Sequence, residues 1–547
     1  MAKKDKTIEN QPGAADTKKA AFLIIGMLLL VVLYLWHMPD VYAGAAGSGD
    51  SFLIRDYIIL GVFLICSCGL LLLLFIKKRA GLAAAYAAAM LLLGTAGIFV
   101  FRGLSAPDEV SHYISAYRLS NVLMLKEAED EYGRVYVREQ DMYLEDTEGR
   151  LDEIRAALDA GEENVDTTLN IFGQRLDEEV YRVYEQGTGN KNAVAEKTAL
   201  SCQWTVNTVP AAYLPQAIGI TAARLAGLGP LGLITLGKLF NLLFFTAVTA
   251  FSVSLIKKGG ELLCAVGLLP MTVHLASSMS YDAYVIGMSF LFIALVLHIR
   301  ESSGAKTAFF ALPVVLALLG PCKIVYSLLI FLLLLVPAKN RRSFFWAAVM
   351  CILLLGISMY LVNSVTLSDY AEAEERIITW AEEPEGYTLS YLIHRPAETV
   401  RIFYDTFMTR TGNWFSTMFG LYLGNQDPVL NVPYPVIGIM AAGLAVIAAG
   451  CDIRLNGREK LVCCTVFLMV LGALMGSMLL AYTPRSSHYI EGVQGRYLLP
   501  VLPLPLAAVS GDWLVPVRKY HREVLASFIL LDAFVLLRVY STVCMRL

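Results

Sequence analysis

Residues 54–76 read IRDYIILGVFLICSCGLLLLLFI and are followed directly by Lys77, Lys78 and Arg79. After Arg55 and Asp56 no charged side chain interrupts this run, which exceeds the ~20 residues that a helix needs to cross the hydrocarbon core of a bilayer. Inside lipid, a single segment satisfies its backbone hydrogen bonds by forming a helix. The run therefore predicts a transmembrane helix whose basic end lies in the cytoplasm.

The composition of the whole chain indicates the same environment. Its 547 residues are 56% apolar and 17% charged, with a mean hydropathy of +0.58 and a net charge of −3. Soluble domains are about 25% charged and about 45–50% apolar. This composition excludes a soluble enzyme, a disordered chain and a basic nucleic-acid-binding protein, so we expect no nucleic acid among the partners.

Twelve further apolar runs are expected to cross the membrane, which gives an all-α polytopic protein with about 13 transmembrane helices. These runs are residues 21–37, 81–101, 233–255, 260–278, 282–299, 307–320, 323–337, 343–363, 433–450, 461–482, 497–513 and 524–542. With the N-terminus in the cytoplasm, every short basic cluster between them lies on the cytoplasmic side, as the positive-inside rule requires. The pair 307–320 and 323–337 also fits a re-entrant hairpin broken at Gly320 and Pro321, and this alternative stays open.

The stretch 209–227 is only moderately apolar and carries two prolines, Pro210 and Pro215. A crossing at this point would move the basic clusters that follow it to the outside. We therefore expect an interfacial helix that lies on the outer membrane surface.

The predicted topology divides the chain into six parts. These are a cytoplasmic tail (1–20), three transmembrane helices (21–101), a first extracytoplasmic loop with a polar box and the interfacial helix (102–232), further transmembrane helices (233–363), a second extracytoplasmic loop (364–432) and the C-terminal transmembrane helices (433–547). Residues 102–208 carry 22 acidic and 11 basic side chains. Such a charge run is typical of a solvated surface, in agreement with a large loop outside the membrane.

The ten cysteines form no pattern of a disulfide framework or a zinc site, because no CxxC pair occurs and most lie in apolar runs. Cys202 lies well inside a polar loop instead. A disulfide bond between Cys202 and Cys322 stays an open possibility.

The polar box lies directly after the third predicted span and reads SAPDEVSHY, residues 105–113. On a helix that begins at Pro107, Asp108, Glu109 and His112 share one side. One interpretation is capping, with Ser105 as the N-cap and the two acids in the first turn. The other is a catalytic group at the membrane edge, with a carboxylate as general base or with two ligands for a divalent cation, Mg²⁺ or Mn²⁺.

A second candidate is the outer turn between the spans 260–278 and 282–299, which reads SMSYD and ends at Asp282. Asp282 fits either the cap of the following helix or a metal ligand beside Asp108 and Glu109. His274 lies about two turns deeper, where an ionisable side chain is costly and suggests function. A neutral, hydrogen-bonded histidine of the core is the alternative.

The third set is cationic and is expected at the outer membrane edge. It consists of Arg102, Lys238, Lys323 and Arg496. Long cationic side chains often snorkel at such positions, which is the simpler interpretation. Gln494 and Tyr497 flank Arg496 and suggest a substrate-binding site instead. Several cations at the membrane edge suit a substrate that carries a lipid phosphate.

Four motifs in this order resemble a family of bacterial multispanning membrane proteins of unknown function. They are P-D-E-x-x-H at Pro107 to His112, Y-L-P at Tyr213 to Pro215, L-P-M…S-x-x-x-Y-D from Leu269 to Asp282, and Q-G-R-Y-L-L-P from Gln494 to Pro500. The likeness covers roughly residues 100–510. The order of elements is also similar to that of the glycosyltransferase C superfamily, whose enzymes use sugars linked to lipid phosphates.

This resemblance implies a bundle of the glycosyltransferase C type in the bacterial plasma membrane, with Asp108 as the catalytic base and Asp282 as an acid that helps to bind a metal. Two features depart from the superfamily. The acidic box follows the third span rather than the first, and no C-terminal extracellular domain is expected. Recognition of the acceptor would then fall to the loops 120–208 and 364–431.

The function that we expect is transfer of a sugar from a polyprenyl-phosphate donor to a glycan or lipid-linked acceptor of the cell envelope, with inversion at the anomeric carbon. Asp108 would act as the base, and Arg496 and Lys323 would hold the phosphate. We expect no nucleotide cofactor, because no Walker or Gly-rich fingerprint occurs. A transporter or flippase of lipid-linked glycans is the alternative, and it would need polar groups near the midplane of the membrane. A structural scaffold is a third possibility.

Overall fold

The computed structural model describes residues 14–76, 80–138, 140–141, 156, 160, 175–187, 198–201, 203, 205–301, 306–337, 341–362, 377–378, 381, 383–511 and 515–546. Its described part is mostly helical. Cys202 and the basic cluster at 77–79 lie outside the described residues, so the predictions about them stay predictions.

Eight helices of the described part are long and apolar enough to cross a membrane. They are α1 (Ala14–Ser48), α2 (Phe52–Ile76), α3 (Leu82–Val100), α8 (Pro230–Leu255), α11 (Asp282–Glu301), α13 (Arg341–Val362), α18 (Gly457–Ala481) and α20 (His521–Cys544). Three shorter apolar helices accompany them, namely α12 (Lys306–Leu319), the 3₁₀ helix η3 (Ile324–Leu335) and α17 (Tyr434–Gly450). The prediction of an all-α, multi-pass membrane protein is confirmed.

Two predicted spans are not continuous helices. Residues 260–278 form α9 (Gly260–Gly267) and α10 (Pro270–Ala276), and residues 497–513 contain the end of η5 (Gly495–Leu498) and then α19 (Pro503–Val509). The physical reason is proline, which has no N–H to donate and whose ring clashes with the preceding turn. Pro270 and Pro503 each begin a new helix.

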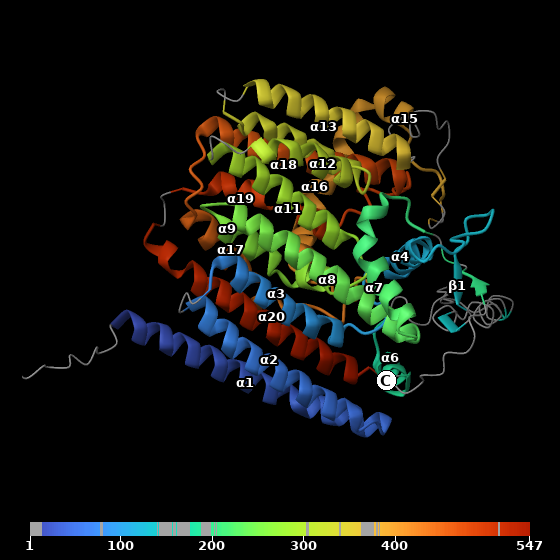
Figure 1. The fold of residues 1–547 in the computed structure, drawn as a ribbon, viewed down its shortest axis with the longest axis vertical. Coiled ribbons are helices and arrows are strands. Elements are labelled where there is room, and N and C mark those ends of the chain that lie inside the picture. The colour runs from blue at the N-terminus through green and yellow to red at the C-terminus, as the bar shows by residue number, and fades with distance from the viewer. Residues whose placement is uncertain are drawn as a thin grey trace, which may run out of the picture.

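The long helices lie side by side as one bundle, with α11 almost wholly buried and α1 and α13 mostly exposed (Figure 1). Helices that are apolar on their exposed side in this way face lipid. In Figure 1, α1, α2 and α20 lie together at one edge of the bundle, although α20 is the last helix of the chain.

The polar elements of the chain gather at one end of this bundle, on the right in Figure 1. They are α4 (Glu109–Leu123), α6 (Glu178–Gly187), α15 (Leu389–His394) and the antiparallel strands β1 (Tyr136–Arg138) and β2 (Thr198–Leu200), and the moderately apolar α7 (Leu214–Leu225) lies at the same end. An ion pair of Arg182 with Asp50 attaches α6 to the connection between α1 and α2, and an ion pair of Glu185 with Arg55 attaches it to the first turn of α2. The C-terminus of the chain lies beside α6, at the same end.

The predicted interfacial helix corresponds to α7, which has 12 residues and is too short to cross a bilayer. It packs between α4 and α8, and Gly219 lies so close to the α8 backbone at Leu236 that a Cβ atom would collide with it. Leu214, Ile218 and Leu225 remain exposed on the opposite side. This spacing leaves one apolar stripe of α7 free for contact with lipid.

Candidate functional site

The polar box begins with a tight turn in front of α4. Asp108 is the N-cap residue of α4 and has a φ of 55°, in the left-handed region that few residues other than glycine adopt. Aspartate and asparagine tolerate this region better than most side chains, because their short polar groups bond locally. The Asp108 carboxylate makes no capping hydrogen bond, however, and the side chain is 70% exposed. Capping therefore does not account for Asp108.

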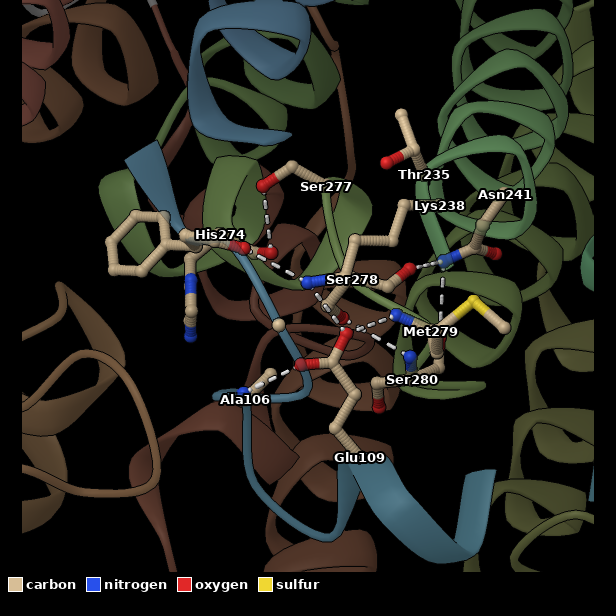
Figure 2. Close-up of polar contacts among 12 residues, drawn as sticks. Ala106, Glu109, Thr235, Lys238, Asn241, His274, Ser277, Ser278, Met279 and Ser280 are labelled. Atoms are coloured by element: carbon tan, nitrogen blue, oxygen red, sulfur yellow. Dashed lines mark hydrogen bonds and ion pairs between the residues drawn. The ribbon is translucent and has the colours of Figure 1, made fainter. Parts of the chain in front are cut away.

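Glu109, the next residue, has the opposite environment, because it is fully buried. Figure 2 shows its polar contacts. Its Oε2 accepts a hydrogen bond from the Ala106 N–H at 2.7 Å, and its Oε1 accepts one from the Met279 N–H at 2.7 Å. Oε1 also lies 3.0 Å from Nζ of Lys238 in α8, which in turn donates to the Phe101 carbonyl at 2.9 Å. Glu109 and Lys238 thus form a buried ion pair that joins the box to α8 and to the turn at Met279.

The turn between α10 and α11 is stabilised by its own serine side chains. Ser278 Oγ accepts from the Ser280 N–H at 3.1 Å, and Ser280 Oγ accepts from the Asp282 N–H at 3.1 Å. Asn241 of α8 donates to the carbonyls of Ser278 and Ser280 at 2.8 and 3.2 Å (Figure 2). Gln216 of α7 donates to Asn241 at 3.1 Å. This network holds Asp282 in one place at the beginning of α11.

Four charged side chains from four segments meet next to this turn, and we call Asp108, Asp282, Lys323 and Arg496 the charged cluster. Arg496 Nη2 lies 3.3 Å from Asp108 Oδ2, and Arg496 Nε lies 3.4 Å from Asp282 Oδ2. Lys323 Nζ lies 2.7 Å from Asp282 Oδ1. Arg496 is 5% exposed and Asp282 is 7% exposed, so water screens their interaction little.

Arg496 belongs to η5, a single turn that the preceding Gly495 anchors. The Gly495 N–H donates to Thr417 Oγ1 at 3.2 Å, and a Cβ atom at Gly495 would collide with the Trp414 carbonyl. Arg496 Nη2 donates to the Tyr497 hydroxyl at 3.2 Å. Arg496 Nη1 is buried and has no hydrogen-bond partner among the described residues. The guanidinium is therefore held in place, while Nη1 keeps its two N–H donors for a ligand.

Aromatic rings surround the cationic side of the cluster. Lys323 Nζ lies 4.1 Å from the centre of the Tyr497 ring and 5.3 Å from that of Tyr281. Tyr326 donates from its hydroxyl to the Tyr497 carbonyl at 2.7 Å. Cation–π contacts of this kind stabilise a cation that is removed from water.

His112 lies one turn after Asp108 on α4, with its ring edge-on to Tyr281 at 5.0 Å between centroids. Its Nδ1 is 2.7 Å from the Tyr213 hydroxyl. Burial lowers the pKa of His112 to about 4, although Asp282 and Asp108 act in the opposite direction. The imidazole is therefore neutral near pH 7 and is hydrogen-bonded to Tyr213 rather than to a carboxylate.

The family described as Predicted membrane protein (DUF2142) matches residues 91–505. The chain belongs to this family. The DUF2142 region includes every residue of the charged cluster and leaves out α1, α2 and α20. No curated protein and no solved structure matches the chain.

Within this DUF2142 protein, six of the predicted site residues lie together: Asp108, His112, Asp282, Lys323, Arg496 and Tyr497. Glu109 and Lys238 lie next to them but are bonded to each other and to backbone groups. Gln494 is half-buried and directly precedes η5.

Arg102 lies elsewhere, since its guanidinium is 2.7 Å from Asp56 of α2 and lies over the rings of Phe99 and Tyr181. It joins the end of α3 to α2 and α6. The expectation that Arg102 helps to bind substrate has no support in this position.

Sequence reasoning did not single out Tyr281, Tyr326, Asn241 or Gln216 as members of the site. Tyr281 stands in the Y-D motif, but nothing about a lone tyrosine indicates that a lysine will lie over its ring. Asn241 did carry a signal, because a polar amide in an otherwise apolar run needs a hydrogen-bond partner inside the protein.

The three carboxylates proposed as metal ligands do not converge on one point. Glu109 already accepts from two N–H groups and Lys238, and Asp282 lies between Lys323 and Arg496. No group of three or more His, Cys, Asp or Glu side chains in the described part could hold a metal ion. Glu109 and Asp282 are already paired with cations of the protein, so a site for Mg²⁺ or Mn²⁺ stays a prediction.

Proposed function

We propose that this DUF2142 protein is a membrane glycosyltransferase that uses a sugar linked to polyprenyl phosphate. The observation that supports the proposal is one exposed carboxylate, Asp108, held beside a buried arginine, Arg496, that has a free donor. A carboxylate of this kind suits a general base, and a buried guanidinium beside Lys323 suits a phosphate. Both stand where helices begin or end, at the membrane edge to which a lipid-linked donor diffuses.

In the proposed reaction Asp108 accepts the proton of an acceptor hydroxyl. The hydroxyl oxygen forms a bond to the anomeric carbon of the sugar from the side opposite the phosphate. The bond between the anomeric carbon and the phosphate oxygen breaks, and polyprenyl phosphate leaves with the electron pair. This single displacement inverts the anomeric carbon, and it needs the base within about 3 Å of the attacking hydroxyl.

Arg496 and Lys323 would stabilise the negative charge of the departing phosphate. Asp282 lies between these two cations. A phosphate oxygen would take a free Nη1 donor of Arg496. Because Nη1 is covered by neighbouring atoms, binding requires the side chains above it to move.

We further propose the finer topology that the sequence predicts, with about 13 crossings in a bundle of the glycosyltransferase C type, a cytoplasmic N-terminus and an extracytoplasmic site. The gathering of α4, α6, α7 and α15 at one end of the bundle supports it, as does the C-terminus at that end, since an odd number of crossings puts the termini on opposite sides (Figure 1).

Labelling from outside tests this orientation. We expect Tyr132→Cys, at a position that is 69% exposed beside β1, to react with an impermeant thiol reagent on intact cells. Arg458→Cys, exposed at the beginning of α18, should react only after permeabilisation. The unsubstituted chain gives the background of native cysteines. The reverse pattern would overturn the orientation.

Replacement of Arg496 tests the phosphate site. Arg496→Lys keeps the charge but loses the planar fork, so the apparent KM for the donor should rise and transfer should fall tenfold or more, at about 1.4 kcal/mol per decade. Arg410→Lys is a matched control, because Arg410 lies over the ring of Tyr489 in the same region but outside the charged cluster. Wild-type transfer by Arg496→Ala would reduce Arg496 to a structural anchor.

The activity itself is tested in two steps. Deletion of the gene should remove or truncate one envelope glycan, and purified protein in liposomes should transfer the missing sugar from its polyprenyl-phosphate form. An unchanged envelope glycan profile, together with no transfer from any donor of this class, would exclude the proposed function.

One observation favours the alternative of a transporter or flippase. Asp532 lies near the middle of α20 and is 2% exposed, and neither carboxylate oxygen has a hydrogen-bond partner among the described residues. Acids at membrane depth occur in transport pathways. A transporter would expose Asp108→Cys to thiol reagents from both faces of the membrane, whereas the transferase would expose it from one face.

A further inference from the structure

Helix α16 (Pro396–Met418) belongs to the second predicted loop but is not a polar loop element. It has 23 residues, long enough to cross a bilayer, yet it carries Glu398, Arg401, Asp405 and Arg410 along its length and is not among the candidate spans. Its charged side chains make a position across the middle of the membrane costly, so its apolar side chains must have another environment.

The side chains of α16 divide into three faces at the 100° rotation per residue of an α-helix. One face packs on the protein through Ile402, Thr406 and Trp414, which are 7%, 0% and 3% exposed. A second face is polar and consists of Glu398, Arg401, Asp405, Thr409 and Asn413, of which Asp405 is half-buried and the others are exposed. The third face carries large apolar side chains that are 46–69% exposed: Val400, Tyr404, Phe407, Met408 and Phe415. We call this third face the apolar stripe.

A stripe of five large apolar side chains exceeds what a surface in water normally exposes. A helix with one apolar face and one charged face has the form of a helix that lies in the plane of the membrane interface. Its first face explains why it does not lie free on the lipid, since that face packs against residues 490–498 of the chain. The Ile490 N–H, for example, donates to Thr406 Oγ1 at 2.8 Å.

Tyrosines around α16 indicate the same depth. Tyr482, at the end of the candidate span α18, is 44% exposed, and Tyr434, at the beginning of α17, is 66% exposed. Tyr391 in α15 stacks under Arg485, which follows α18. Tyrosine is enriched where a membrane meets water. Exposed tyrosines at the ends of α17 and α18 and the exposed apolar stripe of α16 are thus both typical of the depth at which membrane meets water.

We propose that α16 is a membrane-surface helix whose apolar stripe inserts into one leaflet of the bilayer, on the side of the charged cluster. The occupant of this face is lipid. Lipid on one side and water on the other account for both exposed faces, the apolar stripe and the face that carries Arg401 and Asp405. A second copy of the chain or another protein on the apolar stripe would leave the polar face unexplained.

The insertion has a consequence for the charged cluster, because α16 ends against it. Gly495, directly before Arg496, lies so close to Trp414 and Met418 of α16 that a Cβ atom would collide with their backbone atoms. A leaflet that holds α16 therefore also fixes the depth of Arg496. If the proposed function holds, the lipid part of the donor lies along α16 with its phosphate at Arg496, but the insertion itself does not depend on that function.

Spin labelling of the full chain in phosphatidylcholine nanodiscs tests the proposal. Tyr404→Cys on the apolar stripe and Arg401→Cys on the polar face are compared in a Cys66→Ser background, since Cys66 is an exposed native cysteine. The spectrum of that background is subtracted. Oxygen partitions into lipid and a neutral nickel chelate stays in water, so their ratio of collision rates reports the environment of each label.

We expect the label at 404 to collide more often with oxygen than with nickel, and the label at 401 to show the reverse. Labels at 400, 408 and 415 should resemble 404, and labels at 405, 409 and 413 should resemble 401, which gives an oscillation with the period of the helix. A label at 404 that prefers nickel would mean a solvated stripe and would overturn the proposal. Protection from both reagents would also overturn it, in favour of a protein partner or a second copy. Loss of sugar transfer leaves this readout unchanged, so the two proposals fail separately.

Discussion

Asp108→Asn is expected to fold like the wild-type protein, to retain donor binding and to lose transfer by a factor of about 10²–10⁴, which is the usual contribution of a positioned base. The backbone makes this a clean test. With φ at 55°, most side chains at this position would add strain, but asparagine is accepted in the left-handed region almost as readily as aspartate. The substitution therefore removes charge and basicity and little else.

Asp108→Gly is the matched control for the backbone, because glycine adopts a positive φ without strain. It lacks the amide group, so it also shows whether an uncharged hydrogen-bonding side chain substitutes for the base. Both variants should melt at the wild-type temperature and both should be inactive in the liposome assay. A well-folded Asp108→Asn protein with full transfer would remove the base assignment and most of the case for an enzyme.

Glu109→Gln is expected to be the most destabilising of the conservative changes, even though it lies next to Asp108. The substitution leaves the Lys238 ammonium buried without its carboxylate, and removal of one partner from a buried ion pair costs about 3–5 kcal/mol. Lys238→Met should cost a similar amount, because Glu109 then keeps its charge but loses its cation. Thermal unfolding of the purified proteins in detergent measures both losses.

The double variant Glu109→Gln, Lys238→Met separates an ion pair from a metal site. It removes both charges together, so it should recover much of the stability that each single variant loses, and the coupling between the two sites should be large. If Glu109 instead bound a divalent cation, Lys238→Met would be nearly neutral. Added Mg²⁺ or Mn²⁺ would then raise the melting temperature of wild-type protein but not of Glu109→Gln. That outcome would contradict the ion-pair role assigned to Glu109.

Most of the transmembrane helices could be predicted from the chain alone, often to within a few residues. The run 54–76 corresponds to α2 at Phe52–Ile76, and the run 433–450 corresponds to α17 at Tyr434–Gly450. The reason is that the length of an apolar run is a local property and that lipid tolerates little besides a helix across its core. The segregation of polar elements to one end of the bundle follows from the same property.

The interrupted helices could not be predicted in this way. Hydropathy reports how apolar a segment is, and an interruption whose backbone groups find other hydrogen-bond partners leaves the segment equally apolar. Residues 260–278 are apolar throughout, yet the helix ends at Gly267 and another begins at Pro270. Thr272 Oγ1 donates to the Val266 carbonyl at 2.8 Å and so satisfies one group that the break leaves free. Such compensation depends on neighbours in space.

The kinds of residue in the candidate site could be predicted from sequence, but their separate environments could not. Asp108 and Glu109 are adjacent acids in one box, and their composition, spacing and charge do not distinguish the environment of one from that of the other. The tertiary structure exposes one and buries the other, because Lys238 and the Met279 N–H, both more than a hundred residues away, meet Glu109. Arg496 and Lys323 likewise come to Asp282 from distant segments. The sequence by itself determined which segments form apolar helices, since that depends on local hydrophobicity. Only the tertiary structure decided which carboxylate stays exposed, since that depends on the donors that folding brings to it.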